Sequence, residues 1–144
     1  MPRVEKSALV PFSDQAMFDL VKDVERYAEF LPWCSSSELL SEEGSRLCGR
    51  IEVARLGVRQ AFSTCNTCDP PQHMSIELQE GPFKSLHGAW EFIALREDAC
   101  KVMLTLEFEF SSRLMNTAFG KVFEQIANTL VESFCKRAKE LYGD

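Results

Sequence analysis

The amino-acid sequence predicts an α+β fold, in which a strongly curved antiparallel sheet of about six to seven strands wraps around a long C-terminal helix. Two patterns carry this prediction. From about residue 34 to residue 110, apolar and polar residues alternate with a period of two, as is typical of strands with one covered face. From Leu114 to Tyr142, apolar residues recur at helical spacing. The helix is therefore expected to cover the apolar face of the sheet.

The first 33 residues predict a strand followed by two helical segments. Residues 3–10 resemble a short strand that Pro11 ends, and residues 13–14 suit the start of a helix. The apolar residues of that helix are Met17, Phe18, Val21 and Val24. A second helical turn, residues 24–31, is expected to stop at Pro32, because proline cannot continue a helix.

The alternating region divides into clear strand segments. They are residues 47–54, 58–68, 74–79, 86–92 and 102–110, and turn residues such as Gly57, Pro71 and Gly81 separate them. The C-terminal helix can be capped by Ser111 or Ser112 and ended by Gly143. At roughly 1.5 Å per residue it is long enough to cross the concave face of the sheet. Such an arrangement favours an apolar cavity between sheet and helix, of the kind that small molecules occupy.

The composition indicates which classes of protein this chain can belong to. The chain has 144 residues, 45% of them hydrophobic, which suits one domain over residues 1–144 with a single core. Sixteen basic and 22 acidic residues give a net charge of −6, which argues against DNA as a partner. No apolar run approaches the roughly 20 residues of a membrane-spanning helix. No signal-peptide core follows the N-terminus, so we expect a cytoplasmic protein.

The six cysteines are expected to be buried thiols rather than a disulfide framework or a metal site. Cys65 and Cys68 form a CxxC, and His73 and His87 follow at loose spacing. A second CxxC is missing, however, and residues three apart on a strand point to opposite faces. We therefore predict no metal.

Three stretches resemble the coenzyme Q-binding branch of the START-like (polyketide cyclase/dehydrase) superfamily. They are residues 20–34 (LVKDVERYAEFLPWC), 81–92 (GPFKSLHGAWEF) and 108–143. That branch includes the bacterial ribosome association toxin and mitochondrial coenzyme Q-binding proteins. The resemblance covers essentially the whole chain and implies a helix-grip, START/Bet v 1-like fold. It also implies a cavity for a lipophilic molecule, with ubiquinone (coenzyme Q) as the leading ligand and no other cofactor required.

The resemblance implies more than one role. The first is support of respiration by binding ubiquinone or a related lipid; the alternative is a toxin that binds the large ribosomal subunit and blocks subunit joining. A third, the oligoketide or polyketide cyclase, needs an acid or base inside the cavity. The chain contains none of the common catalytic motifs, and His87, Glu91, Glu107 and Glu109 fall on the polar faces of their strands. We therefore predict a binding protein without catalytic residues, not an enzyme.

The candidate ligand-binding residues are large apolar side chains expected to face inward. On the sheet these are Phe62, Trp90, Phe92, Phe108 and Phe110, and on the helix Met115, Phe119, Val122, Phe123 and Ile126. An isoprenoid tail needs only apolar area, worth about 25 cal/mol per Å² buried. Each of these residues also suits a role as core filler, since every helix-on-sheet domain must fill its interior.

Two further groups are candidates for contact with partners. Phe30, Leu31, Pro32 and Trp33, with Phe83, suit a cavity mouth that touches the inner membrane transiently while a quinone is exchanged; the alternative is a hydrophobic plug. Arg46, Arg50, Arg55 and Arg59 surround one hairpin and are the candidate contact with the large ribosomal subunit, because phosphate contacts supply most sequence-independent affinity for RNA. The alternative is a solvated strand face, with Glu52 among the arginines.

Overall fold

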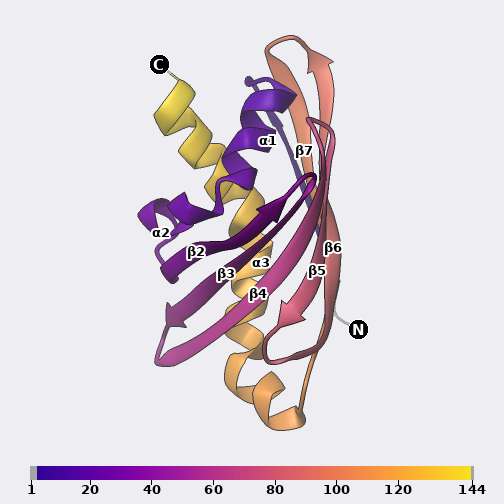
Figure 1. Ribbon diagram of the computed structural model, residues 1–144. Coiled ribbons are helices and arrows are strands. Elements are labelled where there is room, and N and C mark those ends of the chain that lie inside the picture. Colours follow the sequence, from indigo (N-terminus) through magenta and orange to yellow (C-terminus); the bar gives the residue numbers. More distant parts are fainter. Residues whose placement is uncertain (1–2, 144) are drawn as a thin grey trace.

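The computed structural model describes residues 3–143, so the predicted domain bounds extend past the described range by residues 1, 2 and 144. Figure 1 shows seven strands curved around one long helix. The elements are β1 (Arg3–Val10), α1 (Asp14–Lys22), the 3-10 helix η1 (Val24–Arg26), α2 (Tyr27–Phe30), β2 (Cys34–Glu43), β3 (Arg46–Arg55), β4 (Val58–Asp69), β5 (His73–Glu80), β6 (Phe83–Arg96), β7 (Ala99–Phe110) and α3 (Arg113–Tyr142).

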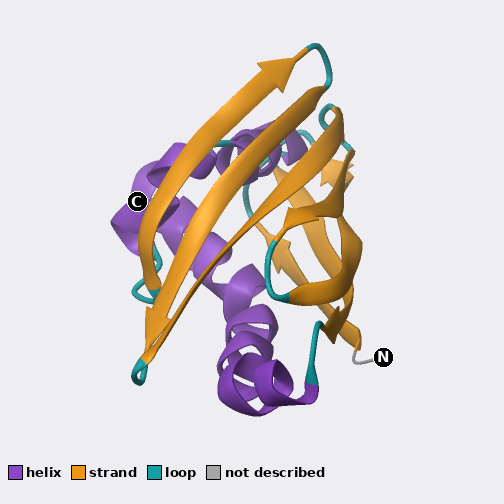
Figure 2. Cartoon of the chain, turned by 60° about the horizontal axis from the view of Figure 1, so that its bottom comes forward, coloured by secondary structure: helices purple, strands orange, loops and turns teal. Residues whose placement is uncertain are grey.

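The strands form one antiparallel sheet in the order β1-β7-β6-β5-β4-β3-β2. Consecutive strands from β2 to β7 are neighbours, and α1, η1 and α2 carry the chain from the edge strand β1 to the opposite edge strand β2. The strands arch over α3, and all helices lie on the inner side of the arch (Figure 2). This arrangement confirms the predicted helix-grip fold.

The strand β2 does not show the alternation expected from about residue 34, so its bounds were not predicted. Its sequence, CSSSELLSEE, is polar, and most of its residues are exposed. Its pairing with β3 shifts register between Cys34 and Ser36 and again between Leu39 and Ser41. A strand with no regularly covered face leaves no period of two in the sequence.

The helix caps are as predicted. The Ser13 hydroxyl accepts a hydrogen bond from the Ala16 N–H at 3.1 Å, and the Ser112 hydroxyl accepts one from the Met115 N–H at 3.0 Å. At the other end of α3, the Gly143 N–H donates to the Lys139 carbonyl at 3.0 Å. Each of these bonds satisfies a backbone group that the helix leaves without a partner.

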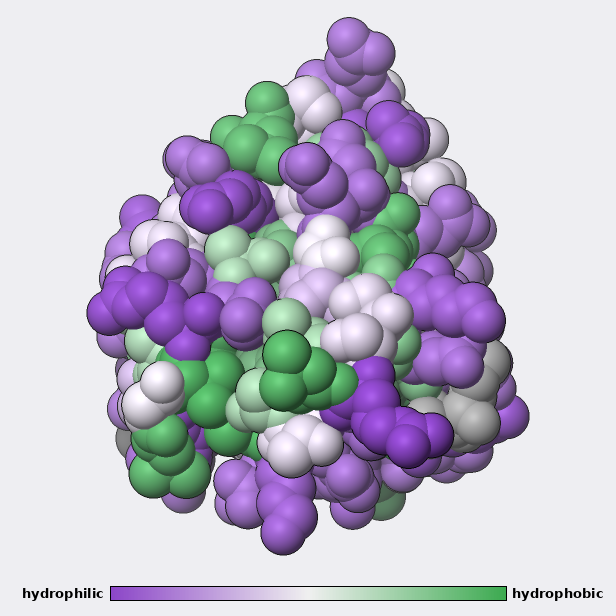
Figure 3. Space-filling view, turned by 90° about the horizontal axis from the view of Figure 1, so that it is seen from below, coloured by the Kyte–Doolittle hydropathy of each residue, from purple (hydrophilic) through white to green (hydrophobic). Residues whose placement is uncertain are grey.

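Six phenylalanine rings fill the space between sheet and helix near the start of α3. This phenylalanine cluster consists of Phe62, Phe83, Phe108, Phe110, Phe119 and Phe123. Most of its ring pairs meet edge to face, an arrangement that aromatic quadrupoles favour. The rings are buried, and the surface at this end of the molecule shows hydrophobic areas interrupted by hydrophilic side chains (Figure 3). This end of the interior is therefore filled.

Gly88 permits the close approach of β6 and β7. It pairs with Leu106, and a Cβ atom at this position would lie 1.9 Å from the carbonyl oxygen of Thr105. Real Cβ atoms do not approach a backbone atom so closely, so any side chain here would push the two strands apart. A strand glycine often marks such a contact between backbones.

One expectation about the cysteines was wrong. Cys48 and Cys65 form a disulfide, with Cα atoms 4.1 Å apart. They lie directly opposite each other on β3 and β4, and opposite residues of antiparallel strands can approach to about 4.5 Å. This proximity depends on strand register, which their spacing along the chain does not reveal. Cys34, Cys68, Cys100 and Cys135 are free, and burial raises the pKa values of Cys34 and Cys100 to about 11.

We predict that Gly88→Ala lowers the free energy of unfolding by about 1–3 kcal/mol, because the added methyl group collides with the backbone of β7. Urea denaturation measures this loss. The control is Ala89→Ser, a similarly small change at the next residue of β6, which faces away from the helix and should stay within about 0.5 kcal/mol of the wild type. Equal stabilities of the Gly88→Ala variant and the wild type would show that β6 and β7 can separate without cost.

Candidate functional site

A cavity of about 100 Å³, here called the central cavity, lies between the concave face of the sheet and the middle of α3. Its walls come from Ile51 and Val53 of β3, Phe62, Thr64 and Asn66 of β4, Ile76 of β5, Leu86 and Trp90 of β6, Leu106 of β7, Phe123, Ile126, Ala127, Leu130 and Phe134 of α3, and Tyr27 and Trp33 near α2. The lining is mostly apolar. The chain has two tryptophans, and both line this cavity.

A second hollow of about 60 Å³, the side cavity, adjoins the central one toward α1 and η1. The two share Tyr27, Ile51, Phe62, Thr64 and Asn66 as lining residues. An apolar hollow of about 150 Å³ is enough to hold a benzene ring. The central and side cavities together reach about this volume, which is room for one unsubstituted ring.

Three polar side chains line both cavities. The hydroxyl of Tyr27 donates a hydrogen bond to the backbone carbonyl of Val21, and burial raises the pKa of Tyr27 far above its ordinary value, so it stays neutral. The Asn66 amide donates through Nδ2 to the sulfur of Met74 at 3.5 Å. Thr64 lies two residues before Asn66 on the same face of β4. Among residues 3–143, no charged side chain lines the central cavity.

The structure separates the predicted ligand-binding residues into two groups. Four line the central cavity: Phe62, Trp90, Phe123 and Ile126. The others lie elsewhere in the interior or at its edge: Phe92, Phe108, Phe110, Phe119 and Val122 are buried without lining the cavity, and Met115 is half-buried at the start of α3. The rings of the phenylalanine cluster fill the space next to Phe108, Phe110 and Phe119, and Phe92 packs against Phe18 of α1.

Several lining residues were missed from the sequence. Ile51, Val53, Ile76, Leu86 and Leu106 lie at inward positions of the alternation, but the emphasis on aromatic side chains left them out. Tyr27 and Asn66 were harder to predict as lining residues from the sequence. Asn66 continues the inward series of Phe62 and Thr64, so a polar residue at an inward position was available as a clue.

Of the predicted mouth residues, Phe83 lies apart from the loop that holds the other four. Leu31 and Trp33 are 1% and 4% exposed, and Trp33 lines the central cavity. Phe30 is half-buried and Pro32 is exposed. Phe83 belongs to the phenylalanine cluster, away from this loop, because β6 starts at the opposite end of the interior. The grouping of Phe83 with the mouth is thus corrected.

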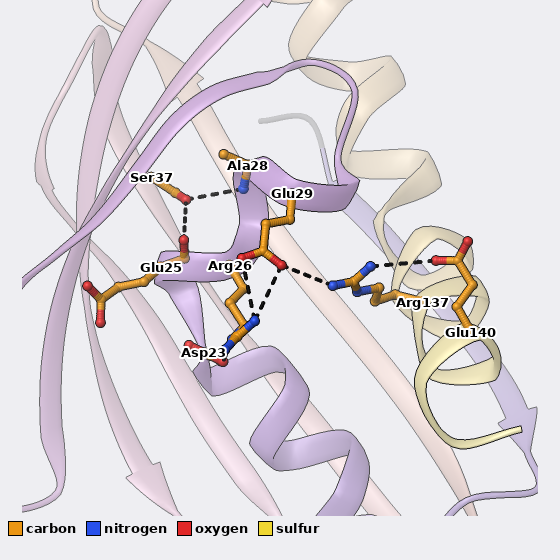
Figure 4. Close-up of polar contacts among 8 residues, drawn as sticks. All are labelled: Asp23, Glu25, Arg26, Ala28, Glu29, Ser37, Arg137 and Glu140. Carbon is orange, nitrogen blue, oxygen red and sulfur yellow. Dashed lines mark hydrogen bonds and ion pairs between the residues drawn. The ribbon is translucent and has the colours of Figure 1, made fainter.

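The helix α2 contributes Tyr27 to the wall of the central cavity. It is attached to α3 by the polar contacts drawn in Figure 4 and by aromatic contacts. Glu29 accepts hydrogen bonds from Arg137 at 3.1 Å and from Arg26 at 3.4 Å, and Arg26 also pairs with Asp23. The guanidinium of Arg137 lies over the Phe30 ring, 5.1 Å from its centroid. Phe134 packs against Phe30 and Tyr27, with ring centroids 5.3 and 5.2 Å apart.

On its other side, α2 is tied to β2 through Ser37. The Ser37 hydroxyl accepts from the Ala28 N–H at 3.2 Å and donates to the Glu25 carbonyl at 3.3 Å (Figure 4). Most of the polar groups that hold α2 are exposed, and exposed ion pairs contribute little to stability. The polar contacts of α2 therefore contribute little to its attachment, and the packing of Tyr27 and Phe30 on Phe134 contributes the rest.

The predicted arginines are exposed on the β3–β4 hairpin but do not form one cluster. Arg55 and Arg59 lie beside the turn, whereas Arg46 lies at the opposite end of β3. Arg59 pairs with Glu52 at 2.7 Å. Glu52 also accepts a hydrogen bond from Ser35, and this bond, together with Arg59, lowers the Glu52 pKa. Within residues 3–143, no ion pair involves Arg46, Arg50 or Arg55. Three arginines of the hairpin are thus available to a partner.

Residues 3–143 show neither a metal-binding group nor a membrane-spanning helix. They contain no group of three or more His, Cys, Asp or Glu side chains able to hold a metal ion. In the same part of the chain, no helix has the length and apolar character needed to cross a membrane.

Comparison with known proteins gives a family match and similar full-length relatives. The family described as polyketide cyclase/dehydrase and lipid transport matches residues 10–135. The chain is 46% identical over 140 residues to the ribosome association toxin RatA of Pseudomonas aeruginosa, and the match covers 97% of each chain. It is 28% identical to the mitochondrial coenzyme Q-binding protein COQ10 homolog B of Xenopus laevis, over 96% of this chain and 58% of that protein.

Among solved structures, the Zhui aromatase/cyclase from Streptomyces sp. R1128 superimposes with a TM-score of 0.84. The match covers 96% of this chain and 93% of that one, at 18% sequence identity. At this identity the likeness concerns the fold alone.

We predict that Arg137→Met loosens α2 while the sheet stays intact. The variant loses the ion pair with Glu29 but keeps an apolar stem beside Phe30, so global stability should change by less than about 1 kcal/mol. Hydrogen exchange should quicken at the Leu31 amide, which donates to the Tyr27 carbonyl at 3.0 Å. The control is Arg96→Met, which removes an exposed pair with Asp98 after β6. Unchanged exchange at Leu31 would mean that the aromatic contacts alone hold α2.

Proposed function

Because this chain belongs to the polyketide cyclase/dehydrase and lipid transport family, we propose that it binds a lipophilic small molecule in the central cavity. The observation that carries the proposal is an apolar hollow between the sheet and α3, next to rings that fill one end of the interior. Core packing in proteins leaves few voids larger than a water molecule, so a hollow of this size is a feature that needs an explanation.

The size of the hollow favours a ring-shaped group. The central and side cavities together have about the volume of a single ring, so the substituted head of a quinone would have to widen them. The likeness to a coenzyme Q-binding protein supports ubiquinone as the candidate. A long isoprenoid tail does not fit beside the ring in the closed interior. The tail would pass beneath α2, whose polar contacts are mostly exposed, because the phenylalanine cluster fills the other end.

The cavity lining supports binding rather than catalysis. A cyclase moves protons, and its acid or base must reach the substrate. The Tyr27 hydroxyl is the most acidic group of the central cavity, and it is bonded to Val21 with its pKa raised. His87 and Glu107 bond each other at 2.9 Å on the opposite face of the sheet. We therefore propose that the protein carries its ligand without converting it.

The proposal predicts that a short-chain ubiquinone quenches the tryptophan fluorescence in a saturable way, because Trp33 and Trp90 both line the central cavity. Ala127→Leu places three more carbons in the cavity wall and should weaken binding at least about tenfold. The matched control, Ala118→Leu, makes the same change at an exposed position of α3 and should bind like the wild type.

Mass spectrometry of an organic extract of the purified protein gives an independent result. A lipid that copurifies with the wild type and is depleted in the Ala127→Leu variant supports the proposal. A wild type that shows no saturable quenching and releases no lipid contradicts it.

A second candidate function is association with the large ribosomal subunit. It is supported by the full-length likeness to a protein named ribosome association toxin and by three arginines without ion-pair partners on the β3–β4 hairpin. Phosphate contacts of this kind make binding salt-dependent. The hairpin arginines are exposed, whereas the central cavity is interior, so the two functions can reside in one chain.

Sedimentation of a cell lysate tests this second candidate. Added wild-type protein should lower the fraction of ribosomes with joined subunits, and the double variant Arg55→Glu, Arg59→Glu should have no such effect while still binding ubiquinone. The control is Arg96→Glu, which reverses one exposed charge at the end of β6 and should act like the wild type. A profile that the wild type leaves unchanged would exclude the ribosomal role.

A further inference from the structure

The two-residue turn between β3 and β4 presents an apolar side chain to solvent. Leu56 is 79% exposed and lies outside the hydrophobic core. Both turn residues have positive φ angles, 52° at Leu56 and 80° at Gly57. Turns of this kind favour Asn-Gly or Gly-Gly, because a side chain such as leucine is strained in this conformation. Leu56 therefore contributes neither packing nor a favourable backbone conformation to the fold.

Leu56 lies between two exposed arginines, Arg55 and Arg59. Arg59 pairs with Glu52 at 2.7 Å, and Arg55 has no ion pair within residues 3–143. Residues that strain a fold without gaining contacts in it are concentrated at functional sites. We propose that the β3–β4 turn docks the protein on an anionic lipid bilayer, with Leu56 among the acyl chains and both arginines at the headgroups. An apolar side chain flanked by cations is complementary to such a surface.

The turn forms a corner of the molecule on the side away from β6 and β7 (Figure 1), and it lies close to the central cavity. The Ala54 N–H donates to the Trp33 carbonyl at 2.8 Å, which places the turn beside the segment that follows α2. Val53, three residues before Leu56, lines the central cavity, as does Trp33. Three residues of a strand span about 10 Å. A protein docked through Leu56 therefore holds one wall of the cavity near the lipid.

Leu56 also favours a bilayer over RNA as the partner of this turn. Arg55 and Arg59 suit the phosphates of either partner. An exposed leucine gains nothing from a phosphate backbone, whereas acyl chains remove its side chain from water. The choice of a lipid surface rests on the proposed function, because a lipophilic ligand resides in a bilayer and its carrier must reach it there. One leucine and two arginines give a weak, reversible attachment, since even a single myristoyl chain binds membranes only marginally.

Vesicle sedimentation of the wild type and of Leu56→Asn tests the inference. The wild type should bind vesicles of phosphatidylcholine with about one-third phosphatidylglycerol at least about fivefold better than pure phosphatidylcholine, and added salt should weaken this binding. Leu56→Asn should bind the mixed vesicles at least about tenfold less, because the apolar side chain is lost. The same variant should be at least as stable as the wild type in urea, since Asn-Gly suits the turn.

The matched control is Leu114→Asn, which removes a leucine that is 78% exposed at the start of α3 and should bind vesicles like the wild type. Leu56→Gly is a second variant that the turn accommodates, and it should lose vesicle binding as Leu56→Asn does. A stable variant with weakened vesicle binding separates docking from a role of Leu56 in folding.

Three results would overturn the docking role of the turn. They are a wild type that does not bind the mixed vesicles, a Leu56→Asn variant that binds them equally well, and a Leu114→Asn control that loses binding to the same extent. A Leu56→Asn variant that keeps vesicle binding but no longer lowers the fraction of joined ribosomes would assign the leucine to the ribosome instead.

The proposed function is measured separately, by quenching with short-chain ubiquinone in the absence of vesicles. Leu56→Asn should be quenched like the wild type, because Leu56 does not line the central cavity. Quenching without vesicle binding overturns the docking surface and leaves cavity binding intact. Vesicle binding without quenching contradicts the proposed function, so the two failures are distinguishable.

Discussion

The interior of this protein depends on the packing of one α3 side chain, Phe123, against the sheet. Its ring centroid lies 4.8 Å from that of Phe108 and 4.9 Å from that of Phe83, and further rings surround these contacts. On one side of Phe123 the phenylalanine cluster fills the space completely; on the other side lies the central cavity. Phe123 therefore packs α3 against the sheet and also forms the boundary between the phenylalanine cluster and the central cavity.

Much of the architecture was predictable, because alternation and helical spacing report directly which face of an element is covered. The pattern reveals inward positions but not the space in front of them. Phe119 and Phe123 are four residues apart on the same face of α3, and both are buried, but only Phe123 lines the central cavity. The difference arises because rings from three strands and the helix fill the space next to Phe119. Spacing along the chain does not show which of these rings meet. Register is equally hidden, as the pairing of Cys48 with Cys65 illustrates.

The two candidate functions draw on separate parts of the structure. Ligand binding depends on interior volume and on access past α2, whereas ribosome association depends on exposed charge at the β3–β4 hairpin. β3 and β4 contribute to both: Ile51 and Phe62 face the cavity, and Arg50 and Arg59 lie on the exposed side. An occupied cavity can therefore affect the hairpin only through the backbone of these strands. The structure gives each function its own surface, and substitutions can separate them.

The irregular strand β2 has a consequence for how the molecule behaves in a crowded solution. An open sheet ends in unpaired backbone groups, and a flat free edge invites another chain to add a strand and begin aggregation. Here the first half of β2 is held by Ser37 against η1 and α2, and the second half carries Glu42 and Glu43 beyond a shift of register. The polar sequence of β2, which shows no alternation, therefore also opposes the pairing of this sheet edge with a strand of another chain.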